Sequence, residues 1–182
     1  YLAILIPLLH EGTVAFTGET MSMQGTIDVA GRAAPAVIVA ALGPKMLDLA
    51  GSVADGTATW MTGPATLRSY TVPTISAAAE RAGRPAPRIS ASLPVCVTDA
   101  PDAAREKAAT EFQVYGFLPS YRAMLDREGA AGPADVAIIG DEALVGKAVG
   151  QLADAGVTEF VAVEYGTREE RARTREVLKS LL

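Results

Sequence analysis

The sequence predicts an α/β protein with parallel strands, more specifically the C-terminal half of a TIM (β/α)8 barrel. Apolar runs bounded by Gly and Pro alternate with helical patterns to the end of the chain. About four strand–helix units fit the chain, whereas a barrel needs eight over ~250 residues. The chain also begins at Tyr1 within an apolar helical pattern. We therefore expect residues 1–182 to be the C-terminal portion of a single TIM-barrel domain. The alternative is a complete doubly wound sheet.

The first elements are a helix, a hairpin and a buried strand. Residues 2–9 are apolar and predict the end of a helix, in which Pro7 favours a kink or a stop. From Gly12 to Gly25, apolar and polar residues alternate around a Gly-containing turn, which is typical of a β-hairpin. Pro35–Leu42 is a continuous apolar run, as in strands that are buried on both faces of a parallel sheet.

Two further units follow in the middle of the chain. A helix is expected from Pro44 to Ala54, followed by a strand over Thr57–Met61. The next helix begins near Pro64, and Pro73 favours an interruption of it. Gly83 is a plausible left-handed residue just after the end of that helix.

The last part of the chain repeats the alternation. We expect a strand over Pro87–Thr98 that bends at Pro94, then a helix from Asp102 that breaks near "GFLPSY" before Arg127. The final elements are a helix from Asp141 to Gly156, a strand over Thr158–Tyr165 and a charged C-terminal helix. The four strands should lie side by side in chain order, with helices on one face of the sheet.

The same strand-to-helix corner occurs twice. Gly43-Pro44 follows one strand, and Gly63-Pro64 follows the next. Ligands of parallel α/β proteins bind beyond the carboxyl ends of the strands, where both corners lie. Gly allows a close approach to the backbone, and Pro at the first helical position gives up an N–H that would be unpaired anyway.

Each corner leaves backbone donors at a helix start. The N–H groups of Lys45 and Met46, and of Ala65 and Thr66, have no partner within their helices. Two such helix N-termini on neighbouring strands predict a phosphate pocket, to which Thr62 would add a hydroxyl and Lys45 a charge. The alternative is that Gly-Pro is only the usual start of a helix. Barrel phosphate sites also tend to follow strands seven and eight, whereas these corners would follow strands five and six.

Three stretches of the sequence carry a resemblance when they are taken together: "ALGPKMLDLAGSVADGTATWMTGP", "AAERAGRPAPRI" and "IGDEALVGKAVGQLADAGVTEFVAVEYG". They resemble the luciferase-like monooxygenase family, and its branch dependent on coenzyme F-420 in particular. The resemblance covers the chain but only the C-terminal part of the family's domain. It implies a TIM barrel that binds a flavin or deazaflavin at its C-terminal mouth. It also implies that the cofactor's phosphate and side chain are held by Ala41, Leu42, Gly43, Pro44, Thr62, Gly63 and Pro64.

The function that the resemblance implies is that of a flavin- or deazaflavin-dependent oxidoreductase. Coenzyme F-420 would transfer a hydride to or from an organic substrate. Two alternatives stay open: an FMN-dependent monooxygenase of the same fold, and a flavin-binding barrel without catalysis. In the family, the early strands commonly supply the catalytic acid or base. No catalytic residue is therefore assigned in this chain.

Composition limits the class of partner. The net charge is −5 without a Lys/Arg stripe, which argues against nucleic acid. The apolar start is too short to span a membrane and lacks the features of a signal peptide. The single Cys favours a reducing cytoplasm, and with a single His it leaves no spacing typical of a metal site. We expect a small-molecule substrate, and a half-barrel's open edges favour self-association into a homo-oligomer.

A few other residues have competing interpretations. Trp60 and Met61 would face the ligand or fill the top layer of the barrel, and Glu164 or Tyr165 would reach the mouth from the last strand. An aromatic insert would form a substrate wall or, slightly favoured, a small satellite core; its residues are Tyr115, Phe117 and Tyr121. We expect His10 to complement a helix end, Cys96 to be buried and inert, and the run "REERARTRE" to be a solvated face with i,i+4 pairs.

Overall fold

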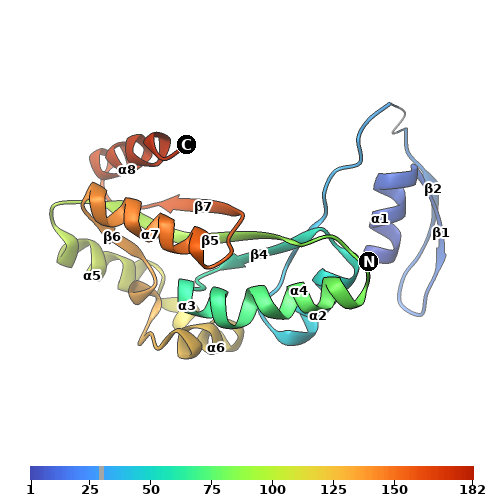
Figure 1. The fold of residues 1–182 in the computed structure, drawn as a ribbon, viewed down its shortest axis with the longest axis horizontal. Helices are drawn as coiled ribbons and strands as arrows, with labels where there is room; N and C mark the ends of the chain where they lie inside the picture. Colours follow the sequence, from blue (N-terminus) through green and yellow to red (C-terminus); the bar gives the residue numbers. More distant parts are fainter. Residues whose placement is uncertain (29–30) are drawn as a thin grey trace.

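A parallel sheet forms the centre of the protein. The structure is a computed structural model that describes residues 1–28 and 31–182. The strands are β3 (Ile38–Ala40), β4 (Gly56–Trp60), β5 (Arg88–Val97), β6 (Ile138–Gly140) and β7 (Glu159–Glu164). β3 pairs with β4, β4 with β5, and β5 with β7, always in parallel (Figure 1). The four strands predicted from the sequence therefore lie side by side in chain order, which confirms that prediction.

The fifth strand, β6, was not predicted, and it explains how Pro94 is tolerated inside β5. On one edge β5 pairs with β4 as far as Ser92 and with β6 from Val95 onward. The carbonyl of Ser92 accepts from Met61 on that edge, and residues two apart in a strand point the same way. The N–H that Pro94 lacks would therefore point into the gap between β4 and β6, where no ladder bond is lost.

Helices follow the strands of the sheet along the chain. They are α2 (Pro44–Val53), α3 (Pro64–Thr66), α4 (Val72–Arg81), α5 (Pro101–Glu111), α6 (Pro119–Glu128), α7 (Glu142–Asp154) and α8 (Arg168–Ser180), with 3-10 turns at Gln113–Gly116 and Pro133–Asp135.

The predicted interruption at Pro73 is wrong. A π-turn over Leu67–Thr71 joins α3 to α4, and the N–H of Val72 donates to the carbonyl of Leu67. The wider turn allows the helix to continue past Pro73, whose backbone nitrogen has no hydrogen to donate to the preceding turn.

The helices cover one face of the sheet and leave the other open. In β5, Ile89, Ala91 and Leu93 are buried, while the alternate residues Ser90 and Ser92 are half-buried. Across the sheet, Ser92 lies opposite Val161, whose exposed fraction is 49%, and Pro94 lies opposite Val163. Ser90, Ser92, Val161 and Val163 form the open face, which is the inner surface expected of a partial barrel, whereas Pro94 is buried.

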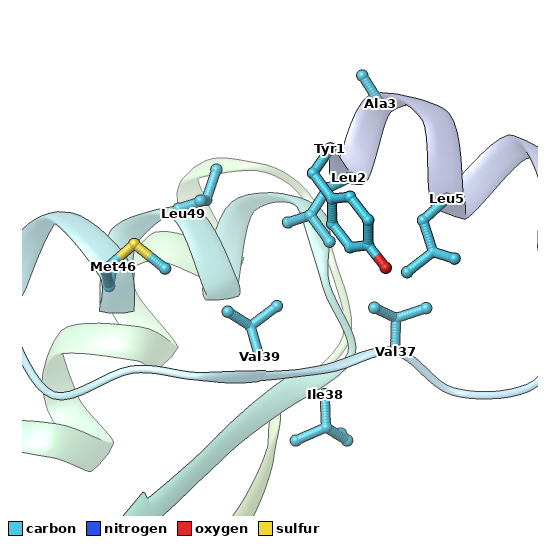
Figure 2. A pocket seen from close by; sticks show the side chains of 9 residues that line it. All are labelled: Tyr1, Leu2, Ala3, Leu5, Val37, Ile38, Val39, Met46 and Leu49. Carbon is cyan, nitrogen blue, oxygen red and sulfur yellow. The ribbon is translucent and has the colours of Figure 1, made fainter. Parts of the chain in front are cut away.

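A helix and a hairpin form an N-terminal arm at one end of the molecule (Figure 1). Helix α1 (Leu2–Glu11) continues through Pro7 and ends at Gly12, whose φ is 75°. β1 (Thr13–Thr17) and β2 (Ser22–Thr26) pair in antiparallel, which confirms the predicted hairpin. Figure 2 shows the apolar groove between α1 and the edge strand β3, with Leu5 near Val37.

The fold class predicted from the sequence is confirmed. The parallel strands, the following helices and the open inner face are those of a TIM-barrel α/β fold with an incomplete barrel. That residues 1–182 are the C-terminal portion of a single larger domain stays a prediction.

Candidate functional site

A pocket of about 450 Å³ opens at the carboxyl ends of β3 and β4. Its walls come from residues 40–43, from Met46 of α2, from residues 58–60 of β4, from Ser92 of β5 and from Ser120 and Tyr121 of α6. Ala41, Leu42 and Gly43 of the predicted cofactor site therefore line it, and Pro44 follows directly. Thr62, Gly63 and Pro64 do not line it. The pocket lies where ligands of parallel α/β folds bind.

The first corner, Ala41–Pro44, is open. Gly43 has an extended backbone (φ −81°, ψ 161°) and precedes Pro44, which occupies the first turn of α2. A Cβ atom added at Gly43 would have no atom within 4 Å. Among the described residues, no acceptor lies within hydrogen-bonding distance of the N–H groups of Lys45 and Met46. The N-terminus of α2 thus presents two backbone donors and the positive end of its dipole beside the pocket.

The second corner, Thr62–Pro64, is filled by the protein itself. The N–H of Ala65 donates to Oε1 of Glu128 at 3.0 Å, and the N–H of Thr66 donates to Oε2 at 2.7 Å. A Cβ atom added at Gly63 would overlap Cδ of Glu128. A phosphate could use these two donors only if the carboxylate left them. Cofactor binding by Thr62, Gly63 and Pro64 stays a prediction.

Met61, the residue that follows β4, has an unusual backbone. Met61 is fully buried, and it is the one non-glycine residue in the described part of the chain with a positive φ, 55°. Such conformations are uncommon outside Gly, Asn and Asp, and they persist where the surrounding structure holds them. Trp60 lines the pocket, as the first of the two alternatives expected. Met61 packs in the core, as the second.

An aromatic cluster backs the pocket. Trp60 packs edge-on against Phe112 and Tyr115, with ring centroids 5.9 and 5.7 Å apart, and Tyr115 packs against Tyr121 at 4.9 Å. The indole N–H of Trp60 is buried and has no hydrogen-bond partner among the described residues. Tyr121 lines the pocket and Phe117 is 79% exposed. Tyr115 and Tyr121 therefore belong to a cluster that packs as a small core and also borders the pocket, whereas the expectation for Phe117 is wrong, because its side chain is exposed and joins neither.

The last strand does not reach the pocket, contrary to expectation. Tyr165 is 3% exposed, its hydroxyl donates to the carbonyl of Ala104 at 3.1 Å, and burial raises its pKa above the usual range. Glu164 forms an ion pair with Arg175 of α8. Both residues therefore stabilise the packing of α5 and α8 and do not line the mouth.

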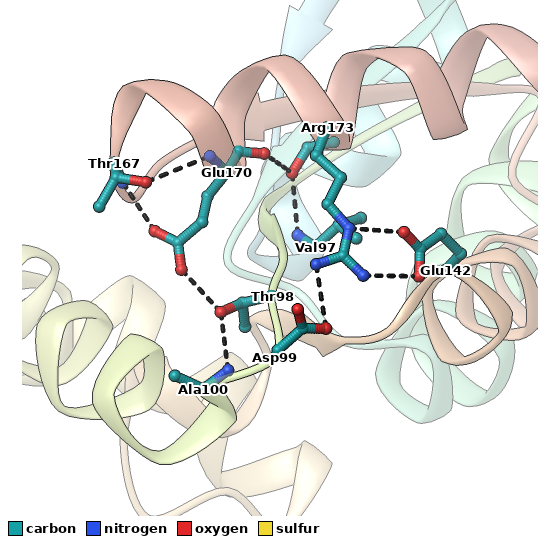
Figure 3. A network of polar contacts seen from close by, with 9 residues as sticks. Val97, Thr98, Asp99, Ala100, Glu142, Thr167, Glu170 and Arg173 are labelled. Atoms are coloured by element: carbon teal, nitrogen blue, oxygen red, sulfur yellow. Dashed lines mark hydrogen bonds and ion pairs between the residues drawn. The ribbon is translucent and has the colours of Figure 1, made fainter.

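Charged residues tie the start of α8 to its neighbours (Figure 3). The carboxylate of Glu170 accepts from the hydroxyl of Thr98 at 2.6 Å and from the N–H of Thr167 at 2.8 Å. These bonds, led by that from Thr98, hold the pKa of Glu170 below its usual value. Arg173 binds Glu142 and Asp99 on other elements. The expected i,i+4 pairing is therefore wrong here, because the arginines bind across elements.

The remaining candidate residues have structural places. Cys96 is fully buried, which confirms that part of the prediction, and burial raises its pKa to about 11, which disfavours the reactive thiolate. His10 lies in the last turn of α1. Within residues 1–28 and 31–182, no group of three or more His, Cys, Asp or Glu is placed to hold a metal ion. None of the described helices combines the length and apolar character that crossing a bilayer requires.

Comparison with solved structures shows the fold. An F-420-dependent secondary alcohol dehydrogenase, in complex with an F-420–acetone adduct, has a TM-score of 0.73 at 19% identity, with 96% of this chain and 58% of that chain covered. The coenzyme F-420-dependent tetrahydromethanopterin reductase from Methanopyrus kandleri has the same TM-score at 23% identity, with 99% and 61% covered.

An FMN-bound protein is also similar. The oxygenating constituent of 3,6-diketocamphane monooxygenase from Pseudomonas putida has a TM-score of 0.61 at 15% identity, with 99% of this chain and 58% of that chain covered. This chain thus spans about three fifths of the length of these proteins. No curated protein matches its sequence. The family model for luciferase-like monooxygenases matches residues 1–181. The chain therefore belongs to the luciferase-like monooxygenase family.

Proposed function

We propose that the chain is part of a flavin- or deazaflavin-dependent oxidoreductase that uses coenzyme F-420 for hydride transfer to or from an organic substrate. The observation that carries the proposal is the open first corner, which borders a pocket with an aromatic wall. Family membership and the F-420-dependent proteins of the same fold support it.

The phosphate of the cofactor would bind at the first corner. Lys45 and Met46 offer two adjacent backbone donors at the positive end of α2, a helix of ten residues. Gly43 leaves space for a ligand to approach the backbone. Proteins that bind phosphate commonly hold the anion at a helix N-terminus, where it accepts hydrogen bonds from two backbone N–H groups. The residues present therefore fit the group.

The ring of the cofactor would lie between small side chains and the aromatic wall. Ala40, Ala58 and Ser92 line the pocket and leave room for a flat group, while Trp60 supplies an apolar edge and an unpartnered indole N–H. When bound, the deazaflavin supplies the hydride chemistry. The residues of this chain bind the cofactor, orient it and exclude water from one side of it.

The second corner has a supporting place in this proposal. Because Glu128 accepts from both Ala65 and Thr66, the N–H groups of that corner are already bonded. Thr62, Gly63 and Pro64 would then lie near the cofactor and support the wall of the pocket without donating to the phosphate. FMN is the second candidate cofactor, since an FMN-bound monooxygenase shares the fold.

Fluorescence titration tests the proposal. The chain contains a single tryptophan, Trp60, so quenching of its emission reports on ligands in this pocket. We expect saturable quenching by coenzyme F-420, weaker quenching by FMN, and loss of both in Gly43→Val. Gly132→Val is the matched control, because Gly132 also has open space around it. Absence of binding by either cofactor would reject the proposal, and binding without turnover of any substrate would favour a non-catalytic barrel.

We further infer a small-molecule substrate and a reducing cytoplasm as the setting, with no nucleic acid and no membrane as partner. A buried free thiol and a net charge of −5 support this inference. Homo-oligomer formation is the third part of it, because the open face of the sheet exposes Val161 and Val163. Sedimentation of the chain at several concentrations tests it, with a concentration-independent monomer as the contrary result.

A further inference from the structure

Helix α6 connects the candidate pocket to the second corner. Its first turn carries Ser120 and Tyr121, which line the pocket. Its last residue, Glu128, reaches the second corner, where the carboxylate accepts from Ala65 and Thr66. A single short helix thus has a pocket wall at one end and a charged contact at the other.

The contact between α6 and the second corner has three parts. Both oxygens of Glu128 accept from backbone N–H groups, at 3.0 and 2.7 Å. The hydroxyl of Thr66 donates to the carbonyl of Met124, one turn earlier in α6, at 3.3 Å. The guanidinium of Arg127 lies 4.0 Å from the centre of the Tyr70 ring. Of these, the Glu128 bonds are charge-assisted and lie at a helix N-terminus, so they are the strongest.

The wall extends from α6 to the end of β4. Tyr121 packs against Tyr115, and Tyr115 packs against Trp60. Packed side chains transmit small displacements because protein interiors have few voids. A shift of α6 away from the second corner would therefore move Tyr121 and change the surroundings of Trp60.

We propose that Glu128 is a positioning residue, whose carboxylate clamps α6 onto the second corner and so holds the aromatic wall of the pocket. The second corner then binds the protein's own anion. That this wall serves a cofactor rests on the proposed function, whereas the clamp itself does not.

A double-mutant cycle tests the clamp directly. The three atoms nearest to a Cβ added at Gly63 all belong to Glu128. Gly63→Ala should therefore lower the midpoint of urea unfolding in the wild-type chain and leave it nearly unchanged in the Glu128→Ala background. Equal effects of Gly63→Ala in both backgrounds would overturn the proposal.

Two readouts show whether the clamp positions the wall. In Glu128→Ala, amide exchange at Ala65 and Thr66 should accelerate by about tenfold or more, as expected for a lost charge-assisted bond. The Trp60 emission should shift and become more accessible to a soluble quencher, with far-UV circular dichroism unchanged. Glu128→Gln keeps the shape but can offer one carbonyl oxygen, so it should show a partial effect and covers the case in which the alanine variant does not fold.

Asp126→Asn is the matched control, because Asp126 lies in the same turn of α6 and its carboxylate binds Arg122 on the exposed side. It should leave Trp60 emission and exchange at Ala65 unchanged. Cofactor titration is a separate readout: weaker F-420 binding by folded Glu128→Gln supports a role for the wall in binding. Failure of every variant and the wild type to bind would reject the proposed function, while unchanged Trp60 emission and exchange in Glu128→Ala and Glu128→Gln would reject the clamp.

Discussion

The two Gly-Pro corners have nearly the same local structure and opposite surroundings. Gly43 and Gly63 both precede a Pro in the first helical turn, with φ, ψ of −81°, 161° and −76°, 168°. At the first corner the space beyond Gly43 is empty and the following N–H groups have no acceptor among the described residues. At the second corner Glu128 fills the space and accepts both bonds.

The difference shows that a helix start becomes a ligand site only if the fold leaves it open. Both corners offer the same backbone donors and the same dipole. An unpaired donor is costly when it is buried, so the second corner, which lies against α6, carries an internal acceptor. The first corner borders a pocket, and its donors stay open among the described residues.

Gly63→Val should have the largest effect, and it acts on stability. The added side chain would collide with Cδ and Oε1 of Glu128 and would displace the carboxylate from its two donors. We expect the free energy of unfolding to fall by about 3 kcal/mol. Urea denaturation measures it. A loss below ~0.5 kcal/mol would show that the corner is as open as the first.

Gly43→Val should have the next largest effect, and it acts on binding. The backbone of Gly43 is extended and an added Cβ would have no atom within 4 Å, so stability should hardly change. Its branches would occupy the ligand's space, and the loss of one to two charge-assisted bonds should weaken cofactor binding by roughly ten- to several-hundredfold. Fluorescence titration checks this result. Unchanged affinity in the folded variant would mean that the first corner is only the start of a helix.

Trp60→Phe should weaken binding less. Phe keeps an aromatic edge between Phe112 and Tyr115 but has a smaller ring than Trp, so it offers less apolar contact to the pocket. The lost contact corresponds to about three- to tenfold lower affinity. Cofactor fluorescence is the readout, because the variant has no tryptophan. An unchanged affinity would place the cofactor away from β4.

Lys45→Ala should have a smaller effect still. The side chain is exposed and does not line the pocket, so its charge acts through solvent. We expect less than about 1 kcal/mol, or fivefold, and the difference should disappear at high salt. Titrations at low and high ionic strength test it. A larger, salt-insensitive loss would show that the lysine contacts the phosphate directly.

The smallest effect concerns a third helix start, that of α8. There the carboxylate of Glu170 accepts from a backbone N–H, as the carboxylate of Glu128 does at the second corner. The folded pKa of Glu170 lies below its ordinary 4.5. Its stabilisation is therefore present above pH 4.5 and is lost as pH falls through the folded value. Glu170→Gln should thus be less stable than the wild type at pH 7, and in thermal melts the difference should shrink as the pH is lowered below 4.5. A pH-independent difference would contradict this.

Local features of the sequence determined most of the architecture. Apolar runs located four of the five strands of the parallel sheet, and similar patterns located the hairpin and the helices between them. α7 begins after Asp141, where its predicted helix starts, and the carboxylate of Asp141 accepts from the N–H of Leu144. Gly83 has the left-handed backbone expected after its helix. These features could be predicted because periodicity and capping depend on residues within a few positions of one another.

Only the tertiary structure decided which corner is open. β6 has three residues, as β3 has, but it lies in a shorter apolar run, and it is recognised by its pairing with β5. The contacts of Arg173 and Glu128 join residues far apart in the chain; Glu128 lies 62 positions from Thr66. Two identical dipeptides cannot encode that difference, because it depends on where α6 packs after the chain has folded back. The sequence by itself thus determined two equivalent helix starts, and the packing of α6 closed one of them with the protein's own carboxylate.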